Sequence, residues 1–509
     1  MTVFILVAGA FTGPHVWRDT AARLTADGAE VRTVALTGLG GRPGDPGGAV
    51  DLETHVADVL AVINAVAAAG GREIVLVGHD YGIHPVLGAA DRRAGAIARI
   101  VHLDAGMPRD GVPALAAVPD QRLREEVVER AAGSGEGWSG GELPPPARDA
   151  WSRWGSTAGL SEAALDGLTA LAAPQPLGTL LQPLRLTGAV AEVPVTGVLC
   201  TGNGPGVEML QILVDVGDPA VRALAEARVP FFELPTGHWP MLSCPAELAA
   251  TLIEAASGAG HRLTAADPAR TPAHLRPFLL DVPERPRERA GNTDLYLPDG
   301  PGPHPAVVFV HGGPVPAEAR PTPRDWPTLT GYARHVAGQG VVGVTLDHRL
   351  HAVTDYEVAA ADVADVVERV RADPRVDADR VALWFFSGGG PMAADWLTNP
   401  PAWLRCVAAN YPILSPLPSW GLDGTRFHPA RAVSHAGRLP VVLVRAERES
   451  AEIAATVEEF LAEAARCGAN VEVIDVPEGR HGFETLDPTD GAREAVHRAV
   501  GAVLGRLKG

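Results

Sequence analysis

A serine followed by three glycines ends a strongly apolar segment in the second half of the sequence. Residues 381–386 read VALWFF, and Ser387 is followed by GGG and then by a stretch that suits a helix. A serine on a sharp turn between a strand and a helix has an exposed hydroxyl, and the next backbone N–H can stabilise an oxyanion. Ser387 is therefore a candidate nucleophile, and the amide of Gly388 is a candidate oxyanion donor.

Acidic residues and a histidine follow this serine along the chain. Glu447 and Glu449 come after the apolar segment 441–444, and His481 lies in EGRHGF after the segment 471–476. A histidine that accepts the serine proton while a carboxylate orients it forms a catalytic triad, here in the order serine, acid, histidine. Either glutamate can supply the acid, and the spacing favours Glu449.

A second oxyanion donor is expected upstream of the serine. The sequence HGGP at residues 311–314 directly follows the apolar segment 307–310. The amide of Gly312 or Gly313 can serve as this donor, whereas Pro314 has no N–H to contribute.

The first half of the chain has an aspartate at a comparable turn. Asp80 is the central residue of GHDYG, His238 lies in TGHWPM, and Asp104 follows the apolar segment 100–103. An ionised carboxylate can displace a leaving group or open an epoxide, which gives an alkyl ester that histidine-activated water hydrolyses. Two alternatives stay open, namely proton transfer by Asp80 and His238 without a covalent intermediate, and a domain that has lost its chemistry. Three residues are candidate oxyanion or substrate contacts, namely Ala10 and Phe11 through their amides, and Tyr81.

Apolar segments of strand length alternate with helical patterns in both halves, which is typical of a mostly parallel sheet covered by helices. The helices expected from apolar periodicity include 52–69 and 358–370. The expected strands are Val3–Val7, Val31–Leu36, Ile74–Val77, Ile100–Leu103, Val195–Cys200 and Pro230–Leu234, and then Val307–Val310, Val341–Leu346, Val381–Trp384, Cys406–Ala409, Val441–Val444 and Val471–Val476.

The pattern predicts two domains. The first covers residues 1–257, with a helical cap inserted at about 107–186. A linker rich in Pro, Arg and small residues covers 258–278, and the second domain covers 279–509.

Composition limits the possible partners. The chain has 43 Lys and Arg against 61 Asp and Glu, a net charge of −18, which disfavours nucleic acid and anionic membranes as partners.

Four cysteines without CxxC spacing indicate reduced thiols in the cytoplasm. Dinucleotide, phosphate-loop and HExxH motifs are missing, so we expect no cofactor and no metal. A small-molecule substrate is the expected partner, and a homodimer stays open.

Residues 290–507 resemble the dienelactone hydrolase and prolyl-oligopeptidase branches of the α/β-hydrolase superfamily. The residues that carry this resemblance are HGGP at 311–314, Asp347-His-Arg349, DPRVDADRVALWFFSGGG and EGRHGF. The resemblance implies Ser387 as nucleophile, His481 as base and Glu449 as the acid. The chain departs from the family at Phe385, where the family usually has glycine.

Residues 1–256 resemble a group of α/β hydrolases related to plant esterases and hydroxynitrile lyases. The shared motifs are LVAGAFTGPHVW, LETHVADVL, HLDAGMPRDG and GHWPMLSCPAEL. That group has GHSYGG where this chain has Asp80 and Ile83, and haloalkane dehalogenases and epoxide hydrolases are similar in having G-x-D-x-G.

Together these resemblances predict an α/β fold with two tandem hydrolase domains. They imply a carboxylesterase-like enzyme that hydrolyses an ester, lactone or related acyl bond of a small molecule in specialised metabolism. A peptidase and a non-catalytic scaffold are the alternatives for the whole chain.

Overall fold

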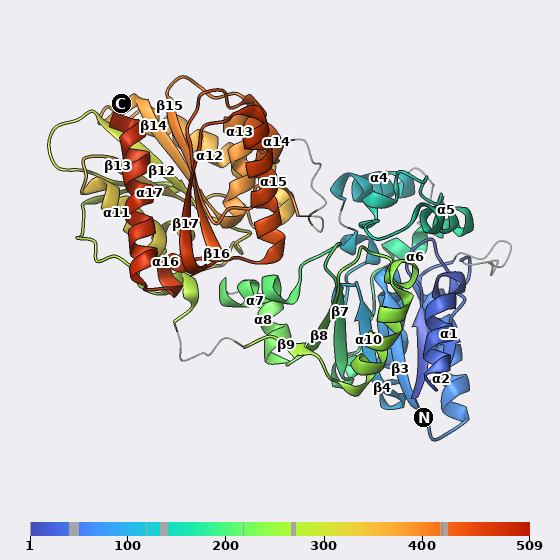
Figure 1. Cartoon of the computed structure of the whole chain (residues 1–509). Coiled ribbons are helices and arrows are strands. Elements are labelled where there is room, and N and C mark those ends of the chain that lie inside the picture. The colour runs from blue at the N-terminus through green and yellow to red at the C-terminus, as the bar shows by residue number, and fades with distance from the viewer. Residues whose placement is uncertain are drawn as a thin grey trace. The chain divides into compact units, whose positions relative to one another are not determined.

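The computed structural model describes residues 2–39, 50–118, 120–132, 141–216, 218–265, 271–417, 420 and 426–508. The chain divides into two compact units, of which the first comprises residues 1–210 and 223–265 and the second comprises residues 211–222 and 266–509. Both units consist of helices around a central sheet (Figure 1). Part of the expected linker, residues 266–270, and part of the expected cap, residues 119 and 133–140, lie outside the described residues.

The first unit contains a seven-stranded sheet in the order β2-β1-β3-β4-β7-β8-β9. Its strands pair in parallel except for β9, which is antiparallel to β8. Helices cover this sheet, α1 packing with α10 and α2 with α3. The strands and helices are β1 (Thr2–Val7), β2 (Glu30–Thr33), β3 (Glu73–His79), β4 (Ile97–Leu103), β7 (Val195–Cys200), β8 (Pro230–Leu234), β9 (His261–Arg262), α1 (Arg18–Ala26), α2 (Leu52–Ala68), α3 (Ile83–Arg92) and α10 (Pro245–Ser257).

Between β4 and β7 the chain leaves the sheet and forms short elements of its own. A small antiparallel pair of strands accompanies the helices of this segment. The elements are α4 (Gln121–Ala132), β5 (Glu142–Leu143), α5 (Glu162–Leu171), β6 (Gln175–Pro176) and α6 (Leu177–Leu181).

The second unit contains an eight-stranded sheet in the order β10-β11-β13-β12-β14-β15-β16-β17. The pairs β10–β11 and β11–β13 are antiparallel, and all pairs from β13–β12 onward are parallel. The strands are β10 (Arg287–Ala290), β11 (Thr293–Tyr296), β12 (His304–Val310), β13 (Val342–Leu346), β14 (Val376–Phe386), β15 (Leu404–Asn410), β16 (Val441–Arg448) and β17 (Val471–Arg480).

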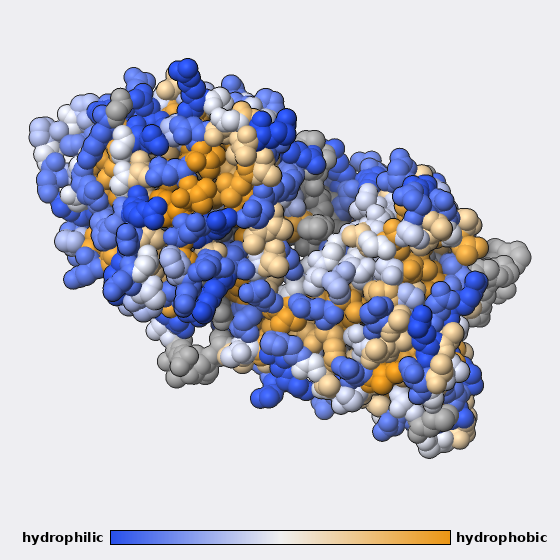
Figure 2. All heavy atoms as spheres, viewed as in Figure 1, coloured by the Kyte–Doolittle hydropathy of each residue, from blue (hydrophilic) through white to orange (hydrophobic). Residues whose placement is uncertain are grey.

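Apolar cores fill both faces of this second sheet. One core joins the sheet to α12, α13 and α15, and the other joins it to α11 and α17. Parallel strands buried on both faces need continuous apolar residues, which is why these strands are readable in the sequence. On the face in Figure 2, hydrophilic residues surround smaller apolar patches. These helices are α11 (Pro327–Ala337), α12 (Tyr356–Arg371), α13 (Ala393–Thr398), α15 (Ala451–Cys467) and α17 (Asp490–Lys508).

The predicted fold class is confirmed, because both sheets are mainly parallel and flanked by helices. The two sheets also share a strand order. The series β2-β1-β3-β4-β7-β8 of the first unit corresponds, strand for strand, to β13-β12-β14-β15-β16-β17 of the second. Residues that follow corresponding strands can therefore be compared directly.

Candidate active sites

Ser387 lies on a strained turn at the carboxyl end of β14. It begins the short helix η10 (Ser387–Met392), and its φ is 49°, in the left-handed region that L-residues rarely adopt. The loop after β12 lies directly against this turn, because a Cβ added to Gly312 would be 2.9 Å from the Cβ of Ser387. Glycine at 312 thus lets the two loops approach closely.

Ser387, His481 and Glu449 are joined by two hydrogen bonds. Ser387 Oγ lies 2.7 Å from His481 Nε2, and His481 Nδ1 lies 2.7 Å from Glu449 Oε2. The side chains of His481 and Glu449 are 9% and 6% exposed. Glu447 instead accepts a hydrogen bond from the backbone N–H of Glu478 at 2.6 Å. Of the two glutamates that the sequence left open, the structure brings Glu449 to the histidine.

The expected oxyanion donors surround the serine. The amide of Gly388 lies in the first turn of η10, where helical N–H groups have no partner within the helix. The Gly388 carbonyl accepts a hydrogen bond from the Tyr356 hydroxyl at 2.7 Å, which fixes this peptide. A Cβ added to Gly388 would be 2.0 Å from the carbonyl oxygen of Gly313, so the two loops are in backbone contact.

Phe385 is fully buried at the position where related turns have glycine. In the first unit the corresponding residue is Gly78, and a Cβ there would be 2.6 Å from the Cα of Ile83. The residue that corresponds to Ile83, three positions after the central residue of the turn, is Gly390. The second unit thus exchanges the small and the large residue, and its α-helix starts later, at Ala393 rather than directly after the turn.

A buried carboxyl group behind His481 was not singled out by the sequence. Glu484 is fully buried and accepts hydrogen bonds from Asn410 Nδ2 at 2.7 Å and from the Tyr332 hydroxyl at 3.1 Å. Burial raises the pKa of Glu484. The ring of Tyr411 lies between this group and the site, with its centre 4.7 Å from that of His481. The available signal was a glutamate three residues after His481.

In the first unit, Asp80 occupies the corresponding turn after β3. Its φ is also 49°, and it begins the short helix η2 (Asp80–Gly82). Asp80 Oδ2 accepts a hydrogen bond from the amide of Ala10 at 3.0 Å. Asp80 Oδ1 faces His238 Nε2 across 3.7 Å, which is too long for a hydrogen bond. The Asp80 side chain is 29% exposed, and that of His238 is 6% exposed.

His238 is bonded to a second carboxylate on its other side. His238 Nδ1 lies 2.6 Å from Asp104 Oδ2, and this aspartate also accepts from Asn203 Nδ2 at 2.7 Å and from the Cys200 amide at 3.1 Å. The sequence analysis did not single out Asn203, which lies in the loop TGNGPG after β7. Burial disfavours the imidazolium, but the hydrogen bond to Asp104 and the charge of Asp80 outweigh it and raise the pKa of His238 to about 10.

The carboxyl group of Asp80 is correspondingly acidic. Burial favours its neutral form, but the neighbouring His238 and the amide of Ala10 outweigh burial and hold the pKa of Asp80 well below its usual range. At neutral pH the site therefore holds an aspartate and an imidazolium as an ion pair.

The other residues expected at this site have hydrogen-bond partners within the protein. The amide of Phe11 donates to Gln175 Oε1 at 2.8 Å, so neither it nor the amide of Ala10 is open to a ligand. The side chain of Tyr81 points into the core, where its hydroxyl lies 2.7 Å from His55 Nδ1. The Tyr81 amide, in the first turn of η2, is the remaining candidate donor.

The segment between β4 and β7 packs onto His238. The backbone N–H of His238 donates to the carbonyl of Ser156 at 2.7 Å, and a Cβ added to Gly155 would lie 2.5 Å from His238 Cγ. The indole N–H of Trp151 donates to the Thr169 hydroxyl at 3.0 Å and is not directed at a ligand. The site is thus covered by backbone rather than by indole donors from Trp151.

Within the described ranges, no group of three or more His, Cys, Asp or Glu side chains is arranged to hold a metal ion. None of the helices in the described part of the chain is long and apolar enough to cross a membrane.

Residues 4–251 match the Alpha/beta hydrolase family. Most of the first unit is therefore similar to this family. A curated relative, the carbendazim hydrolyzing esterase of Nocardioides sp. (strain SG-4G), is 41% identical over 133 residues, which are 26% of this chain and 53% of the relative. The chain thus matches about half the length of this relative. The family match and this relative agree with the predicted enzyme class, an α/β-fold hydrolase.

Solved structures are also similar to this chain. An extracellular α/β-hydrolase from a Paenibacillus species is 19% identical with a TM-score of 0.41, over 50% of this chain and 99% of that one. Tomato methylketone synthase I complexed with 2-tridecanone is 18% identical with a TM-score of 0.37, over 50% of this chain and 98% of that one.

Proposed function

We propose that the chain hydrolyses an ester, lactone or related acyl bond of a small molecule at Ser387. The observation that carries this proposal is the pair of 2.7 Å contacts that link Ser387 to His481 and His481 to Glu449. The match of residues 4–251 to the Alpha/beta hydrolase family, and a curated relative that is an esterase, support this reaction class for the chain as a whole. In this proposal each site belongs to its own domain, residues 1–257 with a cap at 107–186 and residues 279–509.

The geometry supports an acyl-enzyme mechanism. His481 Nε2 accepts the Ser387 proton as the oxygen attacks the acyl carbon, and Glu449 stabilises the imidazolium that forms. The amide of Gly388, with that of Gly312 or Gly313, stabilises the oxyanion. His481 then protonates the leaving alcohol. Water, deprotonated by the same histidine, hydrolyses the acyl-enzyme and restores the serine.

Labelling with an active-site-directed fluorophosphonate tests this proposal. We expect one adduct on Ser387 in the wild-type protein and none on this residue in Ser387→Ala, which is the matched control. Aryl esters and carbendazim form the first substrate panel. A folded wild-type protein that carries no adduct at Ser387 would support a non-catalytic scaffold instead. Amide substrates cleaved as fast as esters would favour the peptidase alternative.

The position of Asp80 favours a second reaction in the first unit, in which its carboxylate displaces a leaving group from an alkyl carbon. With Oδ2 on the amide of Ala10, Oδ1 is the oxygen left to attack. The C–O bond forms as the bond from carbon to the leaving group breaks, and the leaving group departs with the electron pair. Water then attacks the carbonyl carbon of the ester while Oδ2 stays on the amide, and the alcohol is released.

The charges weigh against proton transfer as the alternative role. A carboxylate with a lowered pKa is a weak base, and an imidazolium with a pKa of about 10 is a weak acid. Esterification of Asp80 removes one of the two negative charges that raise the pKa of His238. His238 can therefore become the base for water once the ester has formed.

Isotope incorporation separates these roles. After a single turnover of an alkyl halide or epoxide in H₂¹⁸O, we expect one ¹⁸O atom in the Asp80 carboxylate. Its absence despite turnover would leave proton transfer. Asp80→Ser should lower this turnover by about 10⁴-fold, as loss of a nucleophile typically does. If Asp80→Ser turns over the substrate as fast as the wild type, Asp80 acts neither as a nucleophile nor as a base in this reaction.

A further inference from the structure

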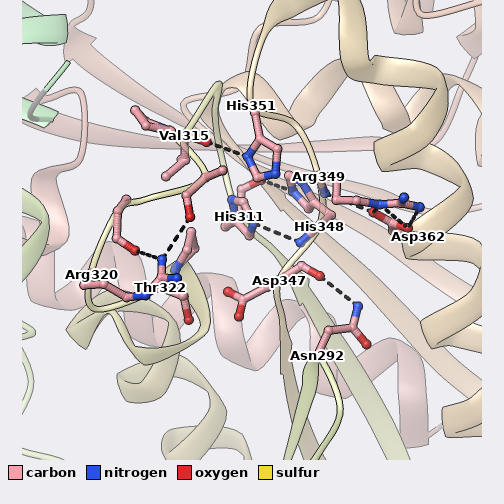
Figure 3. A pocket seen from close by; sticks show the side chains of 14 residues that line it. Asn292, His311, Val315, Arg320, Thr322, Asp347, His348, Arg349, His351 and Asp362 are labelled. Carbon is pink, nitrogen blue, oxygen red and sulfur yellow. Dashed lines mark hydrogen bonds and ion pairs between the residues drawn. The ribbon is translucent and has the colours of Figure 1, made fainter. Parts of the chain in front are cut away.

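A cavity of about 330 Å³ lies in the second unit, beyond the ends of β12 and β13 (Figure 3). Its lining includes His311 and Asp347, the residues that directly follow β12 and β13. Because β12 lies between β13 and β14 in a parallel array, these residues and Ser387 lie at the same edge of the sheet. His311 also precedes Gly312, the glycine packed against Ser387. The cavity and Ser387 therefore lie at the same edge of the sheet, and the chain passes from one to the other at residues 311 and 312.

One wall of the cavity is neutral and well fixed. The rings of His311 and His348 stack with their centres 3.6 Å apart and an angle of 11° between their planes. The His348 backbone N–H donates to His311 Nε2 at 3.3 Å, and His348 Nε2 bonds the His311 carbonyl at 3.0 Å. Burial lowers the pKa of His311 to about 4 and that of His348 well below its usual value. Both rings are therefore neutral at physiological pH, and they add no charge to this buried wall of the cavity.

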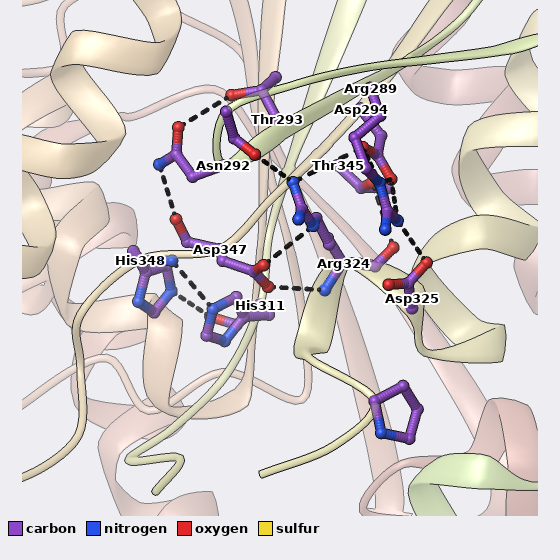
Figure 4. Close-up of polar contacts among 12 residues, drawn as sticks. Arg289, Asn292, Thr293, Asp294, His311, Arg324, Asp325, Thr345, Asp347 and His348 are labelled. Atoms are coloured by element: carbon purple, nitrogen blue, oxygen red, sulfur yellow. Dashed lines mark hydrogen bonds and ion pairs between the residues drawn. The ribbon is translucent and has the colours of Figure 1, made fainter. Parts of the chain in front are cut away.

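The two carboxylates that line the cavity are already compensated. Asp347 pairs with the Nε of Arg324 at 3.0 Å and accepts the Arg324 backbone N–H at 3.0 Å (Figure 4). Asp362 accepts hydrogen bonds from the Arg349 backbone N–H at 3.0 Å and from its guanidinium, with Nη2 at 2.6 Å and Nε at 2.9 Å. These pairs cancel the charges of both aspartates and of Arg349.

Arg320 is the remaining charged residue of the lining. In the described part of the chain, no carboxylate lies within 4.0 Å of its guanidinium. Its Nη1 donates to the carbonyls of Ala317 and Ala319 at 2.9 and 2.6 Å, which fixes the side chain against its own loop. The Nε and Nη2 donors are left for a ligand, and this fork matches the geometry of a carboxylate.

The loop that carries Arg320 is itself held in place. The Val315 amide donates to the Leu350 carbonyl at 2.9 Å, and His351 Nδ1 lies 2.9 Å from the Val315 carbonyl. The loop that carries Arg320 is therefore hydrogen-bonded to residues 350 and 351, which belong to another segment of the cavity lining or lie next to it.

We propose that this cavity binds a carboxylate carried by the substrate of the Ser387 site, and that Arg320 recognises it. The inference rests on the proposed function and narrows its substrate class to esters or lactones with an anionic group near the scissile bond.

Two matched substrates test this proposal. The p-nitrophenyl half-ester of hexanedioic acid carries a terminal carboxylate, and p-nitrophenyl hexanoate has the same chain length without it. We expect Arg320→Gln to lower kcat/KM for the half-ester by about 10-fold or more, because it removes a charge-assisted pair, and to change that for the hexanoate by less than 2-fold. The loss should shrink at high salt. Arg466→Gln, which removes an exposed arginine paired with Glu463, is the control and should change neither value.

An equal effect of Arg320→Gln on both substrates, or no effect on either, would overturn the proposal. A wild-type protein that cleaves neither ester would contradict the proposed function instead. The cavity is then tested by calorimetry with monomethyl hexanedioate, which needs no turnover. We expect binding that weakens at least 10-fold in Arg320→Gln, and equal or undetectable binding in both proteins would refute the site.

Discussion

Glu447 and Glu449 are two residues apart, but their carboxylates have different partners. Glu449 contacts His481, whereas Glu447 holds the backbone of Glu478. We expect Glu449→Gln to lower kcat for an aryl ester by about 10²-fold or more, because the imidazolium loses its counter-charge, and Ser387→Ala or His481→Ala to cost more. Glu447→Gln is the matched control and should stay within 3-fold of the wild type. Steady-state kinetics with the four variants decide this, and an equal loss in Glu447→Gln would contradict the assignment.

The imidazole of His238 should make the stability of the first unit depend on pH. Its pKa of about 10 lies above the value of about 6.5 expected in the unfolded chain. The protonated imidazole therefore stabilises the folded state fully below pH 6.5, and this contribution to the free energy of unfolding is lost as the pH rises toward 10. We expect His238→Gln to lower the free energy of unfolding by a few kcal/mol at pH 6 and by clearly less at pH 10. Urea unfolding of both proteins at each pH measures this, and a difference independent of pH would exclude the ion pair.

Single residues also set the limit of what the sequence predicts about these sites. Ser387, His481 and Asp80 are readable because each lies in a local motif with a known order along the chain. Gln175 and Asn203 are not readable, because they meet their partners only in the folded chain. Gln175 bonds the amide of Phe11, 164 residues away, and Asn203 bonds Asp104, 99 residues away. Polar side chains without a motif give no signal for contacts of this kind.

At the scale of elements, the carboxylate that contacts the histidine follows a different strand in each unit. Glu449 follows β16, but Asp104 follows β4, which corresponds to β15. The strand that corresponds to β16 is β7, and the residue after it that reaches the histidine is Asn203, which lies 3.1 Å from His238 Nδ1. The first unit thus keeps a polar group at the usual place while its carboxylate comes from the neighbouring strand.

Most strands of the two large sheets were predicted within a few residues, but only two helices were predicted, and several of the differences have physical causes. The expected helix 52–69 is α2, which starts at Leu52 because Asp51 and Thr54 form a capping box. The expected strand 471–476 extends to Arg480 as β17, because it continues to pair with β16 beyond an irregularity. Strand β10 was missed, since its sequence RERA is as charged as the expected linker. Its Arg289 pairs with the buried Asp294 on β11, which makes this polar segment part of the sheet.

The packing of the β4–β7 segment on His238 gives a prediction for that element. Gly155→Ala places a methyl group 2.5 Å from His238 Cγ, so the segment or the ring must move. We expect a loss of about 1–3 kcal/mol in stability and a lower turnover at the Asp80 site. Gly167→Ala is the matched control, because α5 leaves open space at that position. Thermal unfolding compares the two variants, and equal transition temperatures would argue against tight packing at residue 155.

At the scale of the whole molecule, the chain carries two candidate sites, with different central residues, on sheets of the same strand order. Each site is complete within its own compact unit, since the Asp80 site uses residues of the first and the Ser387 site residues of the second. Each unit also has its own apolar core. Neither site needs a side chain from the other unit for the contacts described.

The two activities should therefore be independent of each other. We expect Asp80→Asn to leave aryl-ester hydrolysis within 2-fold of the wild type, and Ser387→Ala to leave alkyl-halide or epoxide turnover equally unaffected. In a double-mutant cycle, the effects of the two substitutions on each activity should add, because sites that share no partners rarely couple. The measurement is kcat/KM for one substrate of each class in the wild type, both single variants and the double variant. A drop of more than about 10-fold in ester hydrolysis on Asp80→Asn would contradict independence, and it would mean that the first unit supplies or processes a group that the second unit needs.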